Sequence, residues 1–224
     1  MSDVIYSAEK GDLRLEILND DCGESPREWD NLGTMVCWHR RYNLGDEQPS
    51  ADPHEWMKDL ARSFTNYTEL DCESRRFQAL EDMSFEKAVQ IVDKHCIVLA
   101  LYLYDHSGIT MNTTGFSCPW DSGQVGWIYV THDAIKKEWG RKRLSKKFIK
   151  HIEALLRSEV KVYDLYIRGE VYGFKALKKD SKAEDFDDAE ELDSCWGFYG
   201  TDWEKNGIKE HLSEDFRPLL KELS

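Results

Sequence analysis

Residues that could do chemistry gather around a short loop in the middle of the chain. The segment 116–123 reads FSCPWDSG and places the thiol of Cys118 three residues before the carboxylate of Asp121. Asp105 and His106 open a turn, D-H-S-G, a few residues upstream. Cys118 could serve as the nucleophile of a hydrolase, with His106 or His132 as the base and a carboxylate such as Asp121 to orient the imidazole. The alternative, which the sequence leaves open, is that Cys118 is only packed in the turn that its proline neighbour forms.

The same region offers a metal hypothesis. Cys37 and His39 are spaced as one ligand pair, and Asp105, His106, Asp121 and His132 all flank predicted strand ends. Structural zinc sites use two closely spaced ligand pairs, and only one is present, so we expect neither a metal nor a cofactor. The run DSGQVG lacks the Lys and Ser/Thr that complete a phosphate-binding loop, so no P-loop is predicted.

A second group of polar residues mixes charges with tryptophans near the start of the chain. Its charged members are Arg27, Glu28, Asp30, His39, Arg40, Arg41 and Asp46, interleaved with Trp29 and Trp38. The group could line a substrate pocket. It could equally be a network of ion pairs that joins an irregular loop to a sheet, because charges are buried only when they are paired.

The charge balance indicates the class of partner. The 224 residues include 43 acidic and 30 basic residues, a net charge of −13. Phosphate binding depends on a surplus of Lys and Arg, so direct binding of nucleic acid is not expected, whereas a basic partner or simple solubility is. An acidic run lies in the second half of the chain, at residues 180–193: Asp180, Glu184, Asp185, Asp187, Asp188, Glu190, Glu191 and Asp193. It could imitate a row of phosphates or be a solvated loop.

One stretch has the opposite charge. Residues 136–150 contain Lys136, Lys137, Arg141, Lys142, Arg143, Lys146, Lys147 and Lys150. Such a stretch could contact phosphates, or it could be the solvated face of an amphipathic helix.

Residue patterns predict a single α+β domain over residues 1–224, with a mainly antiparallel sheet and helices packed on it. The apolar run 97–104 is expected to be a central strand buried on both faces. Further strands are expected at 13–18, 109–114, 124–130, 160–168, 171–177 and 192–199, with 160–168 and 171–177 forming a hairpin. Helices are expected to start at Asp52-Pro53, Ser84 and Thr131 and to cover 144–157 and, broken near Pro218, 202–224.

The start of the chain and its cysteines suggest a location. The first residues, MSDVIYSAEKGDLR, lack the apolar core of a signal peptide, and no run is long enough to cross a membrane. The six cysteines are scattered without a C-x-x-C pair. Reduced thiols and a cytoplasmic location, away from membranes, are therefore expected.

Three strings resemble a family of uncharacterised proteins encoded by bacteriophages and other mobile elements. They are SPREWDNLGTMVCWHRRYNLGDE (25–47), FSCPWDSGQVGWIYV (116–130) and DSCWGFYG (193–200), about a third of the chain. The resemblance implies a protein made in the cytoplasm of an infected or element-carrying host cell. It implies no activity, because none is attached to that family.

These observations favour a non-catalytic accessory protein of such an element. It would bind and inhibit a host nucleic-acid-binding or defence protein that has a basic surface, as a nucleic-acid mimic. The expected partner-binding residues are Asp185, Asp187, Asp188, Glu190 and Glu191. The alternative is a hydrolytic enzyme of unknown class that uses Asp105, His106, Cys118 and Asp121.

Overall fold

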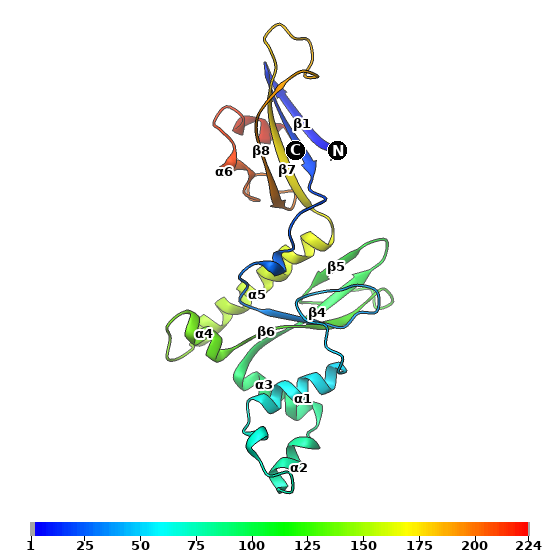
Figure 1. The fold of residues 1–224 in the computed structure, drawn as a ribbon, viewed down its shortest axis with the longest axis vertical. Helices are drawn as coiled ribbons and strands as arrows, with labels where there is room; N and C mark the ends of the chain where they lie inside the picture. Colours follow the sequence, from blue (N-terminus) through cyan, green and yellow to red (C-terminus); the bar gives the residue numbers. More distant parts are fainter. Residues whose placement is uncertain (1–2, 224) are drawn as a thin grey trace. The chain divides into compact units, whose positions relative to one another are not determined.

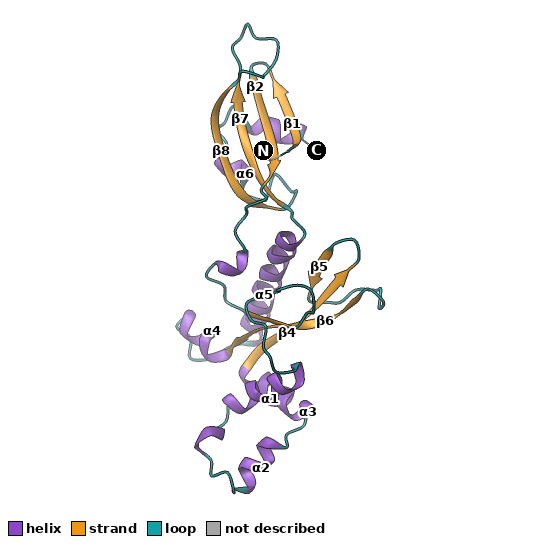
Figure 2. Cartoon of the chain, turned by 45° about the vertical axis from the view of Figure 1, so that its right-hand side comes forward, coloured by secondary structure: helices purple, strands orange, loops and turns teal. Residues whose placement is uncertain are grey.

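The computed structural model describes residues 3–223 and has an α+β fold (Figure 1; Figure 2). Its strands form two four-stranded sheets, each with antiparallel neighbours. The chain divides into two compact units, which we call unit 1 (Met1–Glu28 and Val162–Ser224) and unit 2 (Trp29–Lys161). The predicted α+β class and antiparallel pairing are confirmed, with two sheets where one was expected. That the units form one domain stays a prediction.

Unit 1 is a sheet with its core on one face. Its strands β1 (Val4–Lys10), β2 (Leu13–Asn19), β7 (Val171–Lys178) and β8 (Glu190–Tyr199) lie in the order β1-β2-β7-β8. Figure 1 shows the blue N-terminal strands beside β7 and β8 from late in the chain. The short helices α6 (Ile208–His211) and η3 (Arg217–Glu222) pack their apolar side chains against Leu15, Ile17 and Phe174 of this sheet. On the other face, Arg14 pairs with Glu16 along β2 and Lys175 pairs with Glu191 of β8, because successive side chains of a strand point to opposite faces.

Unit 2 is built on a second sheet, in the order β3-β6-β4-β5. Its strands are β3 (Thr34–Cys37), β4 (Cys96–Asp105), β5 (Ile109–Asn112) and β6 (Ser122–Thr131). Its helical segments are α1 (Pro53–Ser63), η2 (Tyr67–Glu69), α2 (Arg75–Glu81), α3 (Phe85–His95), α4 (His132–Glu138) and the first part of α5 (Lys146–Ile167), while η1 (Pro26–Glu28) is the last segment of unit 1 before unit 2 begins.

Helices cover both faces of β4 and β6. Side chains of α1 and α3 form one cluster with Val98 and Trp127, and the rings of Trp56 and Trp127 stack with centroids 5.6 Å apart. On the opposite face, Leu156 of α5 and Ile128 of β6 both approach Gly33 so closely that a Cβ there would lie 2.5 Å and 2.7 Å from their side-chain atoms. The prediction that 97–104 is a central strand is confirmed, but its burial is incomplete: Ile97, Leu101 and Leu103 are buried and the other residues of the run are half-buried.

The predicted helix starts are confirmed by their caps. The Asp52 carboxylate accepts hydrogen bonds from the backbone amides of His54 and Glu55, with Pro53 in the first turn. The hydroxyls of Ser84 and Thr131 accept from amides three residues further on. Each cap satisfies an amide that the first turn of a helix otherwise leaves without a partner.

The predicted strand at 160–168, and with it the hairpin to 171–177, is wrong. These residues continue α5, which ends at Ile167 before Gly169, a left-handed residue with φ of +72°. The sequence VKVYDLYIR alternates, but its buried Val160 also lies four residues after the buried Leu156 of the preceding helix. Extending an existing helix needs no new nucleus, so the helical period prevails over the short alternation.

The prediction that residues 202–224 are helical, with a break near Pro218, is wrong for most of that segment. Of residues 202–223, only α6 and η3 are helical, and Ser224, which the prediction also included, lies outside the described residues. Asp202, Asn206 and Gly207 form turns instead: the Asp202 carbonyl accepts from the Lys205 and Asn206 amides, and Gly207 has φ of +103°. Residues of these types favour local turns over helix. The strands β1 and β3 and the helix α2 have no counterpart among the predicted elements.

No helix among residues 3–223 has the length and apolar character that a membrane crossing requires.

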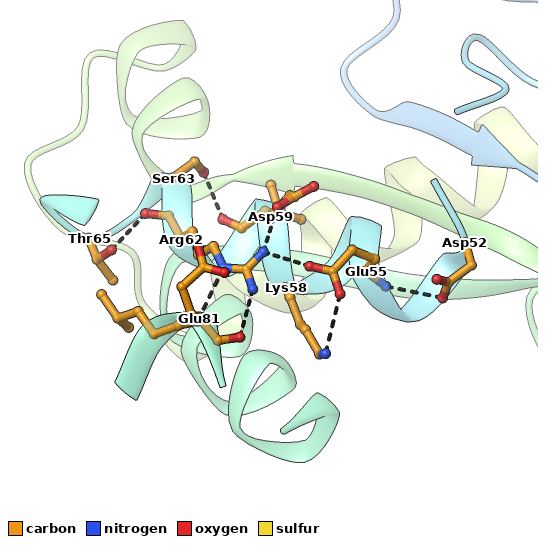
Figure 3. A network of polar contacts seen from close by, with 10 residues as sticks. Asp52, Glu55, Lys58, Asp59, Arg62, Ser63, Thr65 and Glu81 are labelled. Atoms are coloured by element: carbon orange, nitrogen blue, oxygen red, sulfur yellow. Dashed lines mark hydrogen bonds and ion pairs between the residues drawn. The ribbon is translucent and has the colours of Figure 1, made fainter. Parts of the chain in front are cut away.

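Arg62 is the most deeply buried charged residue of α1 and joins this helix to the end of α2 (Figure 3). Its guanidinium donates to the carboxylates of Glu55 and Asp59, both at 2.7 Å. It also donates to the Leu80 and Glu81 carbonyls at 3.2 and 3.1 Å. One guanidinium thus donates to all four acceptors, from a residue that is only 9% exposed. Arg62 therefore fixes the position of the α2 segment against α1.

We expect Arg62→Met to lower the free energy of unfolding by about 2 kcal/mol, because two backbone carbonyls lose a charged donor. The carboxylates of Glu55 and Asp59 are half exposed and recover water, which keeps the cost below that of an isolated buried charge. Urea unfolding measures the change. Lys58→Met is the control, since Lys58 makes only a partly exposed pair with Glu55 and its loss should cost less than about 0.5 kcal/mol. Equal losses for the two variants would contradict this role.

The backbones of β3 and β6 lie very close together at Gly126. A Cβ on Gly126 would lie 1.9 Å from the Val36 carbonyl oxygen and 2.9 Å from the Cys37 Cα, and both are backbone atoms that cannot rotate away. Gly123, three residues earlier in the same strand, has nothing within 4 Å of its Cβ position. The two glycines differ only in what faces them.

Gly126→Ala should therefore separate β3 from β6 and lower the free energy of unfolding by at least about 3 kcal/mol. For a chain of this size that corresponds to a fall in Tm of roughly 6 to 12 °C. Gly123→Ala should leave Tm unchanged or raise it slightly, since the unfolded chain loses freedom and the folded chain loses nothing. Calorimetry on both variants decides, and a tolerated Gly126→Ala would disprove the close contact.

Candidate functional site

A hollow of about 830 Å³ opens in unit 2 where β4 ends and β6 begins. We call it the β4–β6 hollow. Its lining residues are Cys37, Trp38, His39, Arg40, Arg41, Gln48, Pro49, Leu103, Asp105, Trp120, Asp121, Ser122, Gly123, Gln124 and Val125. The Asp105 amide donates to the Asp121 carbonyl at 2.8 Å, which ties the end of β4 to the loop before β6. The sheet thus brings together two carboxylates that the sequence places sixteen residues apart.

Asp105 is held from one side by the segment that follows β3. Arg41 forms an ion pair with its Oδ2, and the Tyr42 hydroxyl lies 3.4 Å from its Oδ1. The His39 Nε2 lies 4.0 Å from the same Oδ2. The Asp105 side chain is only 19% exposed, so three donors surround a carboxylate that has little water left.

His39 is placed so that its Nε2 faces Asp105. Its Nδ1 accepts from the backbone amides of Arg41 and Tyr42 at 3.3 and 3.2 Å, so the hydrogen of the neutral ring sits on Nε2, toward Asp105. Its ring stacks on Tyr42 with centroids 4.9 Å apart. Burial lowers the pKa of His39; the Asp105 carboxylate opposes this, and Arg41 and Arg40 add to it. The neutral ring is therefore a hydrogen-bond donor, and its basic nitrogen is already occupied.

The three residues of the nucleophile hypothesis meet in an order that differs from a catalytic triad. The Cys118 Sγ lies 3.6 Å from Asp121 Oδ2, and the His106 Nδ1 lies 3.7 Å from the same oxygen. The carboxylate thus stands between the thiol and the imidazole, whereas a triad places the imidazole between nucleophile and carboxylate. His106 is 64% exposed, and its ring also lies near that of Tyr104, with centroids 6.3 Å apart.

The residues of the metal hypothesis come together only in part: Asp105, His106 and Asp121 lie near one another, whereas Cys37 and His132 do not join them as ligands. Cys37 is fully buried in β3, and His132 begins α4 at the far end of β6 from Asp121. Within residues 3–223, no three His, Cys, Asp or Glu side chains come together as a metal ion would require.

The mixed string 27–46 is divided among several roles. Asp46 accepts from the Met35 amide at 2.7 Å, and the Trp38 ring donates to the Ala51 carbonyl at 2.8 Å, so both hold the loop to the sheet. Trp29 is 44% exposed. The segment from His39 to Arg41 lines the β4–β6 hollow. The pocket and the network that the sequence leaves as alternatives are therefore each present in part.

The acidic segment (residues 180–193) connects β7 to β8 in unit 1 and includes the start of β8. Glu191 pairs with Lys175 at 2.8 Å, and this pairing lowers the pKa of Glu191. Among residues 3–223, the other acidic side chains of the segment form no ion pair: Asp180, Glu184, Asp185, Asp187, Asp188, Glu190 and Asp193. All of them are exposed. The segment therefore presents carboxylates whose charge is not neutralised within the fold.

An aromatic anchor holds the acidic segment. Phe186 is 6% exposed, and its ring lies under the Arg14 guanidinium at 4.2 Å and the Lys179 ammonium at 4.8 Å. Lys179 also donates to the Glu184 carbonyl at 2.9 Å. Asp180 and Asp185 each accept from an amide two residues further on, as turn residues do. The backbone of the segment is thus attached to the sheet while its carboxylates point to solvent.

Several residues that shape these sites were not among the candidates. Trp120, 92% exposed at the rim of the hollow, is marked in the sequence only as one residue of the loop 116–123. Gln48 and Gln124 line the hollow but follow no motif. Phe186 could have been found, because a single large apolar residue within an acidic run must either be exposed or anchor the run.

The acid–base balance differs between the units. Unit 1 has 24 acidic and 12 basic residues, whereas unit 2 has 19 and 18. Nearly all of the net charge of −13 thus belongs to the unit that carries the acidic segment.

His39 should titrate below its ordinary pKa of 6.5, and Asp105→Asn should move the midpoint lower still, because the carboxylate is the group that favours the charged ring. The unfolded chain takes up this proton first, so the contribution of His39 to stability is complete above pH 6.5 and falls as the pH drops toward the folded pKa. NMR titration of the imidazole follows both effects. Asp121→Asn is the control and should leave the midpoint in place; a midpoint above 6.5 would contradict the assigned tautomer.

Comparison with known proteins leaves the resemblance of the three strings to mobile-element proteins as a prediction. No protein-family model, curated protein or solved structure matches this chain.

Proposed function

We propose that this protein is a binding protein whose acidic segment docks on the basic surface of a nucleic-acid-binding partner and blocks it. The observation that supports this is the acidic segment itself: seven exposed carboxylates without ion pairs, on a backbone that Phe186 attaches to the sheet. A row of carboxylates at fixed positions can meet a row of Lys and Arg that otherwise contacts phosphates. In a cell that carries a phage or mobile element, the partner would be a host nucleic-acid-binding or defence protein.

The acidic segment is already ordered in the free protein, and this affects how tightly it can bind a partner. A mobile acidic loop loses chain entropy when it binds, and this loss offsets part of the electrostatic gain. Here Arg14 and Lys179 both contact the ring of Phe186. The turns at Asp180 and Asp185 hold the backbone of the loop in one conformation in the free protein. Long-range attraction from unit 1, with twice as many acids as bases, would also steer a basic partner toward this end of the sheet.

A second candidate function is hydrolysis in the β4–β6 hollow. The observation in its favour is that Asp105 and Asp121 line one hollow together with two arginines and the neutral His39, while Cys118 and His106 both lie near Asp121. The inverted order of thiol, carboxylate and imidazole favours binding over nucleophilic catalysis, which ranks this function second.

The test neutralises five carboxylates: Asp185→Asn, Asp187→Asn, Asp188→Asn, Glu190→Gln and Glu191→Gln. Wild-type protein immobilised on a support should capture a basic protein from host lysate, and the captured protein should lose affinity for its nucleic acid when wild-type protein is added. The five-residue variant should weaken capture at least about tenfold, because each exposed charge pair contributes some tenths of a kcal/mol to 1 kcal/mol. Capture should also fall as salt is raised.

A matched control removes the same charge elsewhere in unit 1: Asp21→Asn, Glu24→Gln, Glu28→Gln, Glu214→Gln and Asp215→Asn, all at exposed positions. This variant should capture the partner as the wild type does. Equal losses for both variants would reduce the effect to net charge and reject the docking site. A hydrolytic activity that survives the five-residue change but is lost in Cys118→Ala or Asp121→Asn would establish the second candidate instead.

A further inference from the structure

Unit 2 carries a surface of opposite charge to the acidic segment. We call residues 136–150 the basic segment; it comprises the end of α4, the turn that follows and the start of α5. It holds eight basic residues and one acid, Glu138. Lys136 pairs with Asp133 at 2.9 Å. Among residues 3–223 the other seven cations form no ion pair: Lys137, Arg141, Lys142, Arg143, Lys146, Lys147 and Lys150, and all seven are exposed.

The turn between the helices has a defined conformation. Gly140, with φ of +59°, ends α4, and the Arg141 amide donates to the Lys136 carbonyl at 2.9 Å. The Ser145 hydroxyl accepts from the Phe148 amide at 3.2 Å at the start of α5. The Arg141 guanidinium lies 4.0 Å from the centre of the Phe148 ring, so an aromatic contact ties the turn to α5. The cations therefore extend from a backbone that is already ordered.

The start of α5 is an unfavourable place for lysines. The amides of a helix's first turn carry partial positive charge, which stabilises anions and opposes cations. α5 has 22 residues and no acid in its first turn, and Lys146 and Lys147 open it, with Lys150 one turn further on the same side. A bound anion would turn this repulsion into attraction from both the lysines and the helix end.

An exposed indole adjoins these cations. Trp139 is 37% exposed and packs edge-on against Phe148, with centroids 5.6 Å apart, so one side of its ring is held and part of it meets solvent. Cations that follow a phosphate chain, together with an aromatic ring on which an unpaired base can stack, are the elements of single-strand recognition. A surface of carboxylates would use the cations and leave the ring without a role.

We propose that the basic segment binds the phosphate backbone of single-stranded nucleic acid, with one base stacked on Trp139. The net charge of the whole chain argues against nucleic acid, but it is an average over two units. Unit 2 has almost equal numbers of acids and bases, and the basic segment alone has a net charge of +7. Phosphate attraction depends on charge within about a Debye length of about 10 Å at 0.1 M salt, so the local surplus governs it. This surface is separate from the acidic segment, and its role does not depend on the proposed inhibitor function.

The test measures binding of fluorescein-labelled oligothymidylate to the full chain by anisotropy. A four-residue variant, Lys142→Gln, Arg143→Gln, Lys146→Gln and Lys147→Gln, should weaken binding at least about tenfold at low salt. It should also reduce the slope of log affinity against log salt by about three, because each phosphate contact with a single strand contributes about 0.7. The control, Arg75→Gln, Arg76→Gln, Lys87→Gln and Lys94→Gln, removes four exposed cations of α2 and α3 and should change affinity less than about twofold. Equal binding by the two variants would overturn the proposal.

Two further measurements identify the occupant. Trp139→Leu keeps an apolar contact for Phe148 and should reduce the preference for the single strand over a duplex about tenfold, because base stacking is lost. A preference that stays the same overturns the single-strand assignment. Polyglutamate competing as well as the oligonucleotide, or self-association at low salt that the neutralised acidic segment abolishes, would show that a carboxylate surface of a second copy is the occupant and would also overturn it. Thermal unfolding of each variant confirms that it is folded.

Discussion

The structure of unit 2 depends on the pairing of β4 with β6. The register runs from Cys96 opposite Thr131 to Tyr104 opposite Ser122, so the two strands are paired along almost their full length. Apolar side chains on the two faces of this pair bind α1 and α3 on one side and α5 on the other. At the end where the pairing stops, the Asp105 amide still reaches the Asp121 carbonyl, and the β4–β6 hollow begins. The same ladder that organises the core therefore also sets the distance between the two carboxylates of the candidate site.

The sequence predicts those parts of the fold in which a local signal and the tertiary structure agree. The apolar run 97–104 and the caps Asp52, Ser84 and Thr131 each carry their own physical reason, and each is found as expected. The segment 160–168 fails because its alternation competes with the helical period of the residues before it, which only the packing of Val160 and Leu156 decides. β3 has four residues and irregular flanks, so it is defined by its pairing with β6 and not by its own pattern.

The candidate sites show the same limit. Cys118, Asp121, Asp105 and His106 could be named from their types, and they do lie near one another. Their order could not be predicted, because it depends on which rotamers the turn before β6 allows. His39 illustrates the point: its residue type suggests a base, yet two backbone amides occupy Nδ1 and leave only a donor. Which nitrogen of a histidine is free is a property of the surrounding backbone, and residue type gives no access to it.

The two charged segments share one structural device. In each, a phenylalanine fixes the backbone and a cation lies over its ring: Arg14 and Lys179 on Phe186, and Arg141 on Phe148. An ordered loop concentrates like charges, which repel, and the cost is tolerated only if the segment is tied to the fold by contacts that do not neutralise it. An aromatic ring meets this requirement, because it anchors the chain through dispersion and cation–π attraction and leaves the charges exposed. Ion pairs would hold the loops equally well, but they would neutralise the charges that the segments now expose. A phenylalanine at each position therefore orders its segment and leaves most of the segment's charges exposed.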